Sequence, residues 1–201
     1  MPLDSPLVLA AASLARQAHA QQRRKAEGLP YFVHLEAVAR LLFEHGHDHE
    51  PTLAAAYLHD LLEDQPAFEA RLRAEQPAEV VRIVELVTEQ KLDAAGNKRS
   101  KAARFSDYVL ALSVDNPLTR CARAVSCADR IDNATSLVRA ERAGCGLLVQ
   151  LSTRPEEHAL QLATLRPLYQ TVVRPSLLDA FDRAADELER CVQSWVARKA
   201  L

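Results

Sequence analysis

The sequence predicts an all-α protein, and three observations support this fold class. Hydrophobic residues make up 48% of the 201 residues and charged residues 26%, which is an ordinary balance for a globular protein. Glycine occurs only 5 times, while Ala, Leu, Arg and Glu, which all favour helices, are abundant. No segment alternates convincingly between apolar and polar residues with the period of two that a half-buried strand requires. We therefore expect a bundle of about eight to ten helices.

The first helix is predicted over residues 6–27. Ser5 can cap its N-terminus, and Pro6 suits the first turn, where its missing N–H would have no partner in any case. Gly28 and Pro30 are expected to end the helix.

The third predicted helix, over 51–63, is expected to lie at the centre of the fold. Its segment 53–58 is apolar on almost every side, which is typical of a helix with no solvent-facing stripe. The one long polar loop is predicted over 90–100. The remaining helices are predicted over 32–44, 66–74, 77–89, 100–112, 117–143, 154–171 and 175–200.

Composition also limits the domain organisation and the partners. We expect a single domain over 1–201, because chains of this length usually form one core. The net charge of -2 argues against nucleic acid as a partner. The four cysteines form no CxxC pair, so they are expected to be reduced thiols of a cytoplasmic protein. No apolar run reaches the roughly 18 residues of a membrane span, and the sequence leaves monomer and homodimer open.

The most informative segment contains His59, Asp60, Glu63 and Asp64. On a continuous helix, His59 and Asp60 would lie about 100° apart, and each acid would lie one turn after one of them. The negative charges of these carboxylates would repel one another unless a bound cation or substrate offset them. A metal site with a spare acidic pair beside it is typical of a hydrolase, because water must be activated.

Two further residues are candidate metal ligands. His34 lies near the start of the predicted 32–44 helix, where a lone histidine is more often a core residue than a ligand. Asp129 lies within an apolar helix, where an unpaired carboxylate would be costly, although Arg130 or Arg123 could pair with it on the helix surface. Two imidazoles and two carboxylates would leave two positions of an octahedral ion open.

Taken in order, these residues resemble a known family. The order H…HD…D is similar to that of the HD-domain metal-dependent phosphohydrolases. The longer motifs resemble the hydrolase domain of the RelA/SpoT alarmone family, above all its small stand-alone members, over the motif-bearing core 10–142. These motifs are Ala18-His19-x-x-Gln22-x-Arg24, Gly28-x-Pro30-Tyr31-x-x-His34, Ala55-x-x-Leu58-His59-Asp60-x-x-Glu63-Asp64, Val87-Thr88 and Ala128-Asp129-Arg130-x-x-Asn133.

The resemblance implies an HD-domain helical bundle that removes the 3′-pyrophosphate of (p)ppGpp with Mn²⁺. The nucleotide would be the small-molecule partner, and the helices of 150–201 would buttress the core. Within this pattern Glu63 and Asp64 would handle water and protons. The implied metal ligands are His34, His59, Asp60 and Asp129. Arg24 would lie near the scissile phosphate and Asn133 beside the nucleotide.

Departures from the family pattern keep other substrates open. Ser126 stands where many members carry a lysine, and Gln65 where a threonine usually follows the acidic pair. Lys98 and Arg99 in the polar loop would supply charge for a second phosphate group, or would simply be a solvated face. The alternatives are an HD phosphohydrolase acting on another nucleotide or phosphate ester, such as a nucleoside phosphate or NADPH, and a nucleotide sensor without turnover.

Overall fold

The computed structural model describes residues 2–25, 28–146, 148 and 154–199, and it confirms the all-α fold class. Within these residues the only strand-like pairing consists of two isolated bridges, Arg23 with Pro30 and Leu92 with Lys98. Among the described helices, none has an apolar stretch long enough to cross a membrane.

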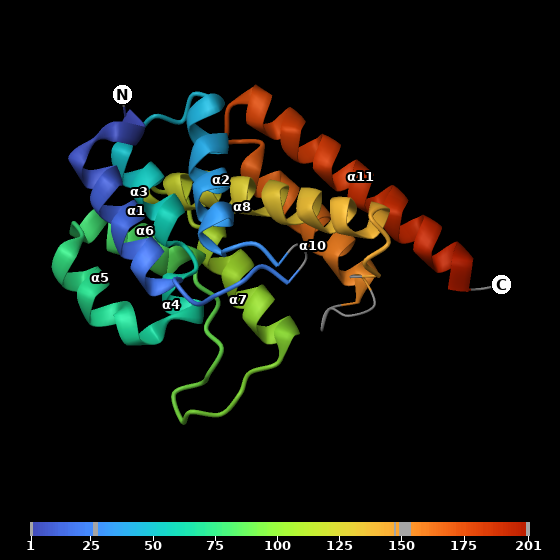
Figure 1. Ribbon diagram of the computed structural model, residues 1–201, viewed down its shortest axis with the longest axis horizontal. Helices are drawn as coiled ribbons and strands as arrows, with labels where there is room; N and C mark the ends of the chain where they lie inside the picture. The colour runs from blue at the N-terminus through green and yellow to red at the C-terminus, as the bar shows by residue number, and fades with distance from the viewer. Residues whose placement is uncertain (1, 26–27, 147, 149–153, 200–201) are drawn as a thin grey trace.

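The helices follow the predicted order along the chain (Figure 1). They are α1 (Pro6–Ala18), α2 (Phe32–Glu44), α3 (Glu50–Leu58), α4 (Leu61–Asp64), α5 (Glu69–Glu75), α6 (Ala78–Val87), α7 (Lys101–Ser113), α8 (Pro117–Arg142), α10 (Pro155–Tyr169) and α11 (Pro175–Lys199). Short 3₁₀ helices at Pro2–Asp4 and Pro66–Phe68 precede α1 and α5. The predicted polar loop over 90–100 joins α6 to α7.

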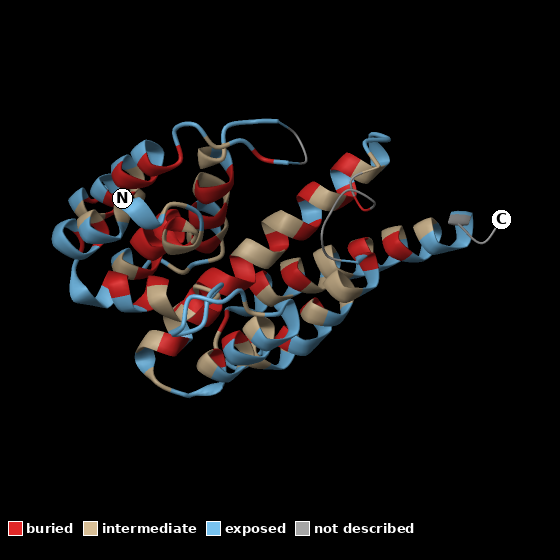
Figure 2. Ribbon diagram, turned by 90° about the horizontal axis from the view of Figure 1, so that it is seen from below, coloured by how far each residue is buried: buried red, intermediate tan, exposed pale blue. Residues whose placement is uncertain are grey.

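Two helices organise the core. Every residue of α3 from Thr52 to Leu58 is buried, as its apolar run predicted. The long helix α8 crosses the middle of the molecule and packs against α2, α3, α6, α7, α10 and α11 (Figure 1). Its central residues 122–128 are all buried, and most of them are small, so neighbouring helices can approach closely. Figure 2 shows this buried stretch of α8 between the surrounding helices.

The first helix ends at Ala18, so the prediction of a helix over 6–27 was wrong beyond this residue. The described part of the following segment folds back on itself, because the Arg24 N–H donates to the Leu29 carbonyl at 2.8 Å and the Tyr31 N–H donates to the Gln22 carbonyl at 2.9 Å. Good helix formers in this segment therefore adopt a loop, since tertiary contacts outweigh a weak local propensity.

The helix predicted over 51–63 is interrupted at His59 and Asp60, which separate α3 from α4. Both residues keep right-handed backbone angles, but Asp60 (φ -92°, ψ -1°) lies outside the ideal helical range. The expectation that these two side chains project from one continuous helix was therefore wrong. The interruption lets both side chains turn toward the same point.

Candidate metal and phosphohydrolase site

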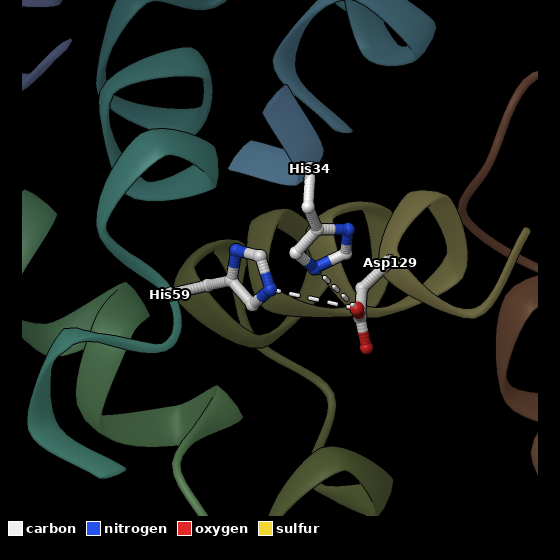
Figure 3. A group of neighbouring side chains, drawn as sticks. All are labelled: His34, His59 and Asp129. Atoms are coloured by element: carbon white, nitrogen blue, oxygen red, sulfur yellow. Dashed lines mark ion pairs between the residues drawn. The ribbon is translucent and has the colours of Figure 1, made fainter. Parts of the chain in front are cut away.

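Three separate parts of the chain bring His34, His59 and Asp129 together. His34 lies in the first turn of α2, His59 follows the end of α3, and Asp129 lies near the middle of α8. The two Nε2 atoms lie 3.2 Å and 3.5 Å from the same oxygen of Asp129, Oδ1, and Figure 3 shows both rings turned toward it. These groups are close enough to hold one metal ion.

Asp60 completes the group. Its Oδ2 atom lies 3.5 Å from His34 Nε2 and 3.1 Å from His59 Nε2. The hydroxyl of Tyr31 donates a hydrogen bond of 2.6 Å to the same oxygen, which fixes the orientation of the carboxylate. The four ligands predicted from the sequence are thus brought together in the structure, and we call His34, His59, Asp60 and Asp129 the metal cluster.

The hydrogen bonds of the two histidines fit a metal. Nδ1 of His34 donates to Asp132 Oδ2 at 2.7 Å, and Nδ1 of His59 donates to the Ala56 carbonyl at 2.8 Å. Their Nε2 atoms are buried and have no hydrogen-bond partner. A buried polar atom without a partner is costly, whereas an imidazole whose second nitrogen is held by a carboxylate or carbonyl is the usual arrangement of a metal ligand.

The charges of the cluster are strongly coupled. Burial lowers the pKa of His34, but the nearby carboxylates of Asp129, Asp132 and Asp60 outweigh burial and raise the pKa to about 10. In the same way, the pKa of His59 is raised although burial opposes the shift. The imidazoles in turn lower the pKa of Asp60 and Asp129 against the effect of burial. The carboxylates therefore favour positive charge at this point, and a divalent cation supplies it without protonating the histidines.

The acidic pair lies in α4, directly after the cluster. Glu63 is largely buried: its Oε1 accepts a 2.6 Å hydrogen bond from the Glu89 N–H. Burial and the charge of Asp60 raise the pKa of Glu63 to about 7. Asp64 accepts hydrogen bonds from Gln22 at 2.8 Å and from Lys91 at 3.1 Å. A carboxyl group that titrates near neutral pH beside a metal site is suited to accept a proton from water.

Two cavities share lining residues, and the inner one adjoins the metal cluster. The inner one, of about 190 Å³, is lined by Tyr31, His59, Asp60, Glu63, Val87, Glu89, Tyr108, Val125, Ser126, Asp129, Arg130 and Asn133. The outer one, of about 380 Å³, is lined by Gln22, Arg23, Arg24, Lys25, Tyr31, Asp64, Arg130, Asn133, Ser136, Leu137 and His158. Three residues, Tyr31, Arg130 and Asn133, line both. The inner cavity carries most of the acidic residues, and the outer one carries most of the basic residues.

The predicted substrate contacts divide into two groups. Arg24 lines the outer cavity, where its guanidinium lies 3.1 Å from Asp132, and Asn133 lines both cavities and donates to Asp129 Oδ1 at 2.5 Å. Lys98 and Arg99 line neither cavity: Lys98 is exposed, and Arg99 pairs with Asp107. The structure therefore brings the first two to the metal cluster, but not the last two.

Ser126 lies in the wall of the inner cavity, and its hydroxyl is fully engaged. The hydroxyl of Tyr108 donates to Ser126 Oγ at 2.5 Å, and Tyr169 OH lies 2.7 Å from the same atom. All three residues are buried. A trio of hydroxyls thus occupies the place where a lysine was expected from the family pattern.

Sequence reasoning missed several residues that contact the predicted site. Asp132 bridges His34 and Arg24, and its position three residues after Asp129 could have indicated that it shares a helix face. Tyr31 belongs to the recognised motif but had no assigned role. Lys91 gave no signal, because it contacts Asp64 across 27 positions of the chain.

Comparisons with known proteins agree with this arrangement. A family model described as an HD domain matches residues 11–153. The chain is 32% identical over 136 residues to a guanosine-3′,5′-bis(diphosphate) 3′-pyrophosphohydrolase of Aquifex aeolicus, covering 68% of this chain and 18% of the relative. It is 34% identical over 125 residues to the protein of that name in Haemophilus influenzae, covering 62% of this chain and 18% of the relative. The chain thus spans less than a fifth of these relatives.

A solved structure supports the same fold along nearly the whole chain. It is described as a metazoan ortholog of SpoT that hydrolyses ppGpp and plays a role in starvation responses. It superposes with a TM-score of 0.69 at 22% identity and covers 94% of this chain and 97% of its own. At this level of identity the likeness establishes the fold. Together with the family model, which spans most of the chain and contains all four residues of the metal cluster, it shows that the chain belongs to the HD-domain family.

Proposed function

We propose that this protein is a metal-dependent phosphohydrolase that removes the 3′-pyrophosphate of (p)ppGpp, releasing GDP or GTP and pyrophosphate. The observation that carries the proposal is the pair of buried, unpartnered imidazole nitrogens that face two carboxylates, with Glu63 and Asp64 beside them. The relatives named as (p)ppGpp pyrophosphohydrolases support the choice of substrate.

The donor set supports Mn²⁺ as the cofactor. His34, His59, Asp60 and Asp129 would hold it, because imidazole ligands shift preference from Mg²⁺ toward Mn²⁺ and similar ions. When bound, the metal would lower the pKa of water and neutralise charge on the attacked phosphate.

The residues of the chain divide the remaining work. Glu63, with its raised pKa and its place in the inner cavity, would take the proton from the attacking water. Asp64, which lines the outer cavity and accepts hydrogen bonds at both oxygens, would orient the water, and the departing oxygen would receive the proton that Glu63 had taken. Tyr31 holds Asp60 in place, and Asp132 does the same for His34.

The outer cavity would bind the nucleotide. Arg23, Arg24, Lys25 and Arg130 line it and together offer guanidinium and ammonium groups for phosphate oxygens. Arg24 would approach the scissile phosphate, and Asn133 would contact the nucleotide from the opening between the two cavities. Lys98 and Arg99 would reach a second phosphate group only if the 90–100 loop moved toward the cavity.

One observation favours a second candidate, hydrolysis of another nucleotide or phosphate ester, such as a nucleoside phosphate or NADPH. Ser126 is bound by two tyrosine hydroxyls, so this wall of the inner cavity carries hydroxyls where a lysine was expected. A substrate with fewer phosphate groups near this wall would need less positive charge.

The four cysteines bear on the compartment in which the protein would act. Cys121, Cys127, Cys145 and Cys191 are free thiols, which suits a reducing compartment, and we therefore place the protein in the cytoplasm. There it would take part in the stringent response by removing the alarmone. It would act as a monomer or homodimer with a nucleotide as its small-molecule partner.

The decisive test is product release from ppGpp by the purified protein, with Mn²⁺ and again after chelation. GDP and pyrophosphate released only with metal are expected. A panel of nucleoside phosphates and NADPH, assayed in parallel, would identify the second candidate. Tight binding of ppGpp by metal-loaded protein without turnover of any substrate would instead indicate a sensor and contradict both candidates.

A further inference from the structure

Lys91 is the cation in direct contact with the acidic pair, and it lies in the segment that follows α6. Its ammonium donates to the Glu63 carbonyl at 2.9 Å and to Asp64 Oδ1 at 3.1 Å. It also lies 3.6 Å from Glu63 Oε2. One side chain thus contacts the backbone of α4 and both of its carboxylates.

With Lys91 in place, every oxygen of the acidic pair has a partner. Glu63 Oε1 accepts from the Glu89 N–H, and Oε2 faces Lys91. Asp64 Oδ1 accepts from Lys91, and Oδ2 accepts from Gln22. Three of these four contacts come from Glu89 and Lys91, in the segment after α6, and the fourth comes from Gln22, in the segment after α1. The orientation of the acids therefore depends on a short exposed segment.

The charges around Glu63 give Lys91 a second effect. Burial, Asp60 and the carboxylate of Glu89 raise the pKa of Glu63, whereas the Glu89 N–H and Lys91 lower it. Glu89 itself lies 3.8 Å from Arg104, which moderates its repulsion. Among these opposing charges, Lys91 is the cation that acts directly on Glu63.

We propose that Lys91 is a positioning residue, which holds Glu63 and Asp64 in the orientation needed to activate the attacking water. In the described part of the chain it contacts no residue of the metal cluster and lines neither of the two cavities. Its loss should therefore slow turnover without emptying the metal site. This inference rests on the proposed function, because it assigns Lys91 a role in the same reaction.

The test compares Lys91→Met with Lys91→Arg under saturating Mn²⁺. Lys91→Met should lower kcat about 10- to 100-fold, as is usual when a partner of an active-site group is lost, with metal content and KM near wild type. Because Glu63 loses its cation, its pKa should rise, and the acid limb of the pH profile should move to higher pH. Lys91→Arg keeps the charge and should recover most of the activity.

A matched control removes the same charge elsewhere. Arg82 is 60% exposed and lies on α6, where it pairs with Glu85, so Arg82→Met should keep wild-type kcat and pH profile. The Lys91 side chain is itself 43% exposed, so Lys91→Met should fold. An unchanged kcat and pH profile in Lys91→Met would overturn the proposal. It would also be overturned if Lys91→Met and Lys91→Arg lost bound metal and activity to the same extent.

A measurement that needs no activity separates this inference from the proposed function. In metal-free protein labelled with ¹³C-glutamate, NMR titration of the Glu63 carboxyl should give a higher pKa in Lys91→Met than in wild type. If wild type hydrolyses no substrate but this shift is seen, the proposed function fails while the contact of Lys91 with Glu63 stands. An unshifted Glu63 refutes the role of Lys91 whatever the activity.

Discussion

The metal cluster and the acidic pair are neighbours, but they are held in different ways. His34, His59 and Asp129 project from α2, the end of α3 and α8, which pack against one another in the core. Glu63 and Asp64 lie in the four-residue helix α4, and their oxygens are bound by Gln22, Glu89 and Lys91 from connecting segments.

This difference separates two requirements of the proposed chemistry. Metal ligands must keep a fixed geometry, and buried helices that cannot move independently provide it. Groups that transfer protons must meet a substrate, and segments near the surface can adjust when it binds. Variants of the metal cluster should therefore abolish metal binding, while variants of the acidic pair should leave the metal in place and slow the reaction.

The largest effect is expected for Asp60→Ala. Losing this carboxylate removes one of four metal-binding groups and leaves His34 and His59 with a single shared partner, so both bound metal and turnover should be lost. Metal content after dialysis and product release measure the two losses. Mn²⁺ at about 100 times its Kd should stabilise wild type by about 2.7 kcal/mol, and the melting temperature of Asp60→Ala should not respond. Retained metal and activity would remove Asp60 from the cluster.

The next largest effect is expected for Glu63→Gln. The amide cannot accept a proton, so kcat should fall about 10²- to 10⁴-fold, while the metal content stays near that of wild type. The wild-type pH profile should decline as pH falls through the range near 7 where Glu63 becomes protonated, because a base must be ionised. Bound metal weakens the repulsion by Asp60, so this decline should begin at or below pH 7.

One outcome of that experiment would change the comparison between the metal cluster and the acidic pair. Loss of metal in Glu63→Gln would make Glu63 a metal ligand, and the acidic pair would then belong to the cluster. Glu79→Gln, an exposed acid at the start of α6, serves as the matched control and should keep wild-type activity and pH dependence.

The fold class was predictable because it depends on a repeated pattern rather than on single contacts. The period of the apolar residues and the buried run in α3 were sufficient to predict a helical protein with a central buried helix. The end of α1 was not predictable in the same way. Residues after Ala18 favour helix locally, but in the structure Gln22 pairs with Tyr31 and Arg24 with Leu29, and the described part of the segment forms a loop.

The candidate site shows the same limit. The motifs predicted His34, His59, Asp60 and Asp129 as metal ligands, because these residue types occur in a fixed order in the family pattern. The motifs do not show which contacts orient these groups, even where they contain the residues concerned, such as Tyr31 and Gln22. Tyr31 reaches Asp60 across 29 positions, and Gln65, which departs from the family pattern, bonds to Gln22 across 43. Contacts between residues so far apart become visible only once the helices are packed.

The smallest effect is expected for Asp132→Asn. This variant tests whether metal binding by the cluster depends on hydrogen bonds from neighbouring residues, as the orientation of the acidic pair does. Asp132 accepts from His34 Nδ1 at 2.7 Å and lies 3.1 Å from Arg24. An asparagine keeps the shape but loses the charge that makes the imidazole a stronger ligand, so Mn²⁺ affinity should fall about 10- to 100-fold. At saturating Mn²⁺, kcat should recover. Mn²⁺ titration followed by activity measures both. If kcat stays low at saturation, Asp132 acts through Arg24 on the substrate, and the cluster is as dependent on neighbouring segments as the acids are.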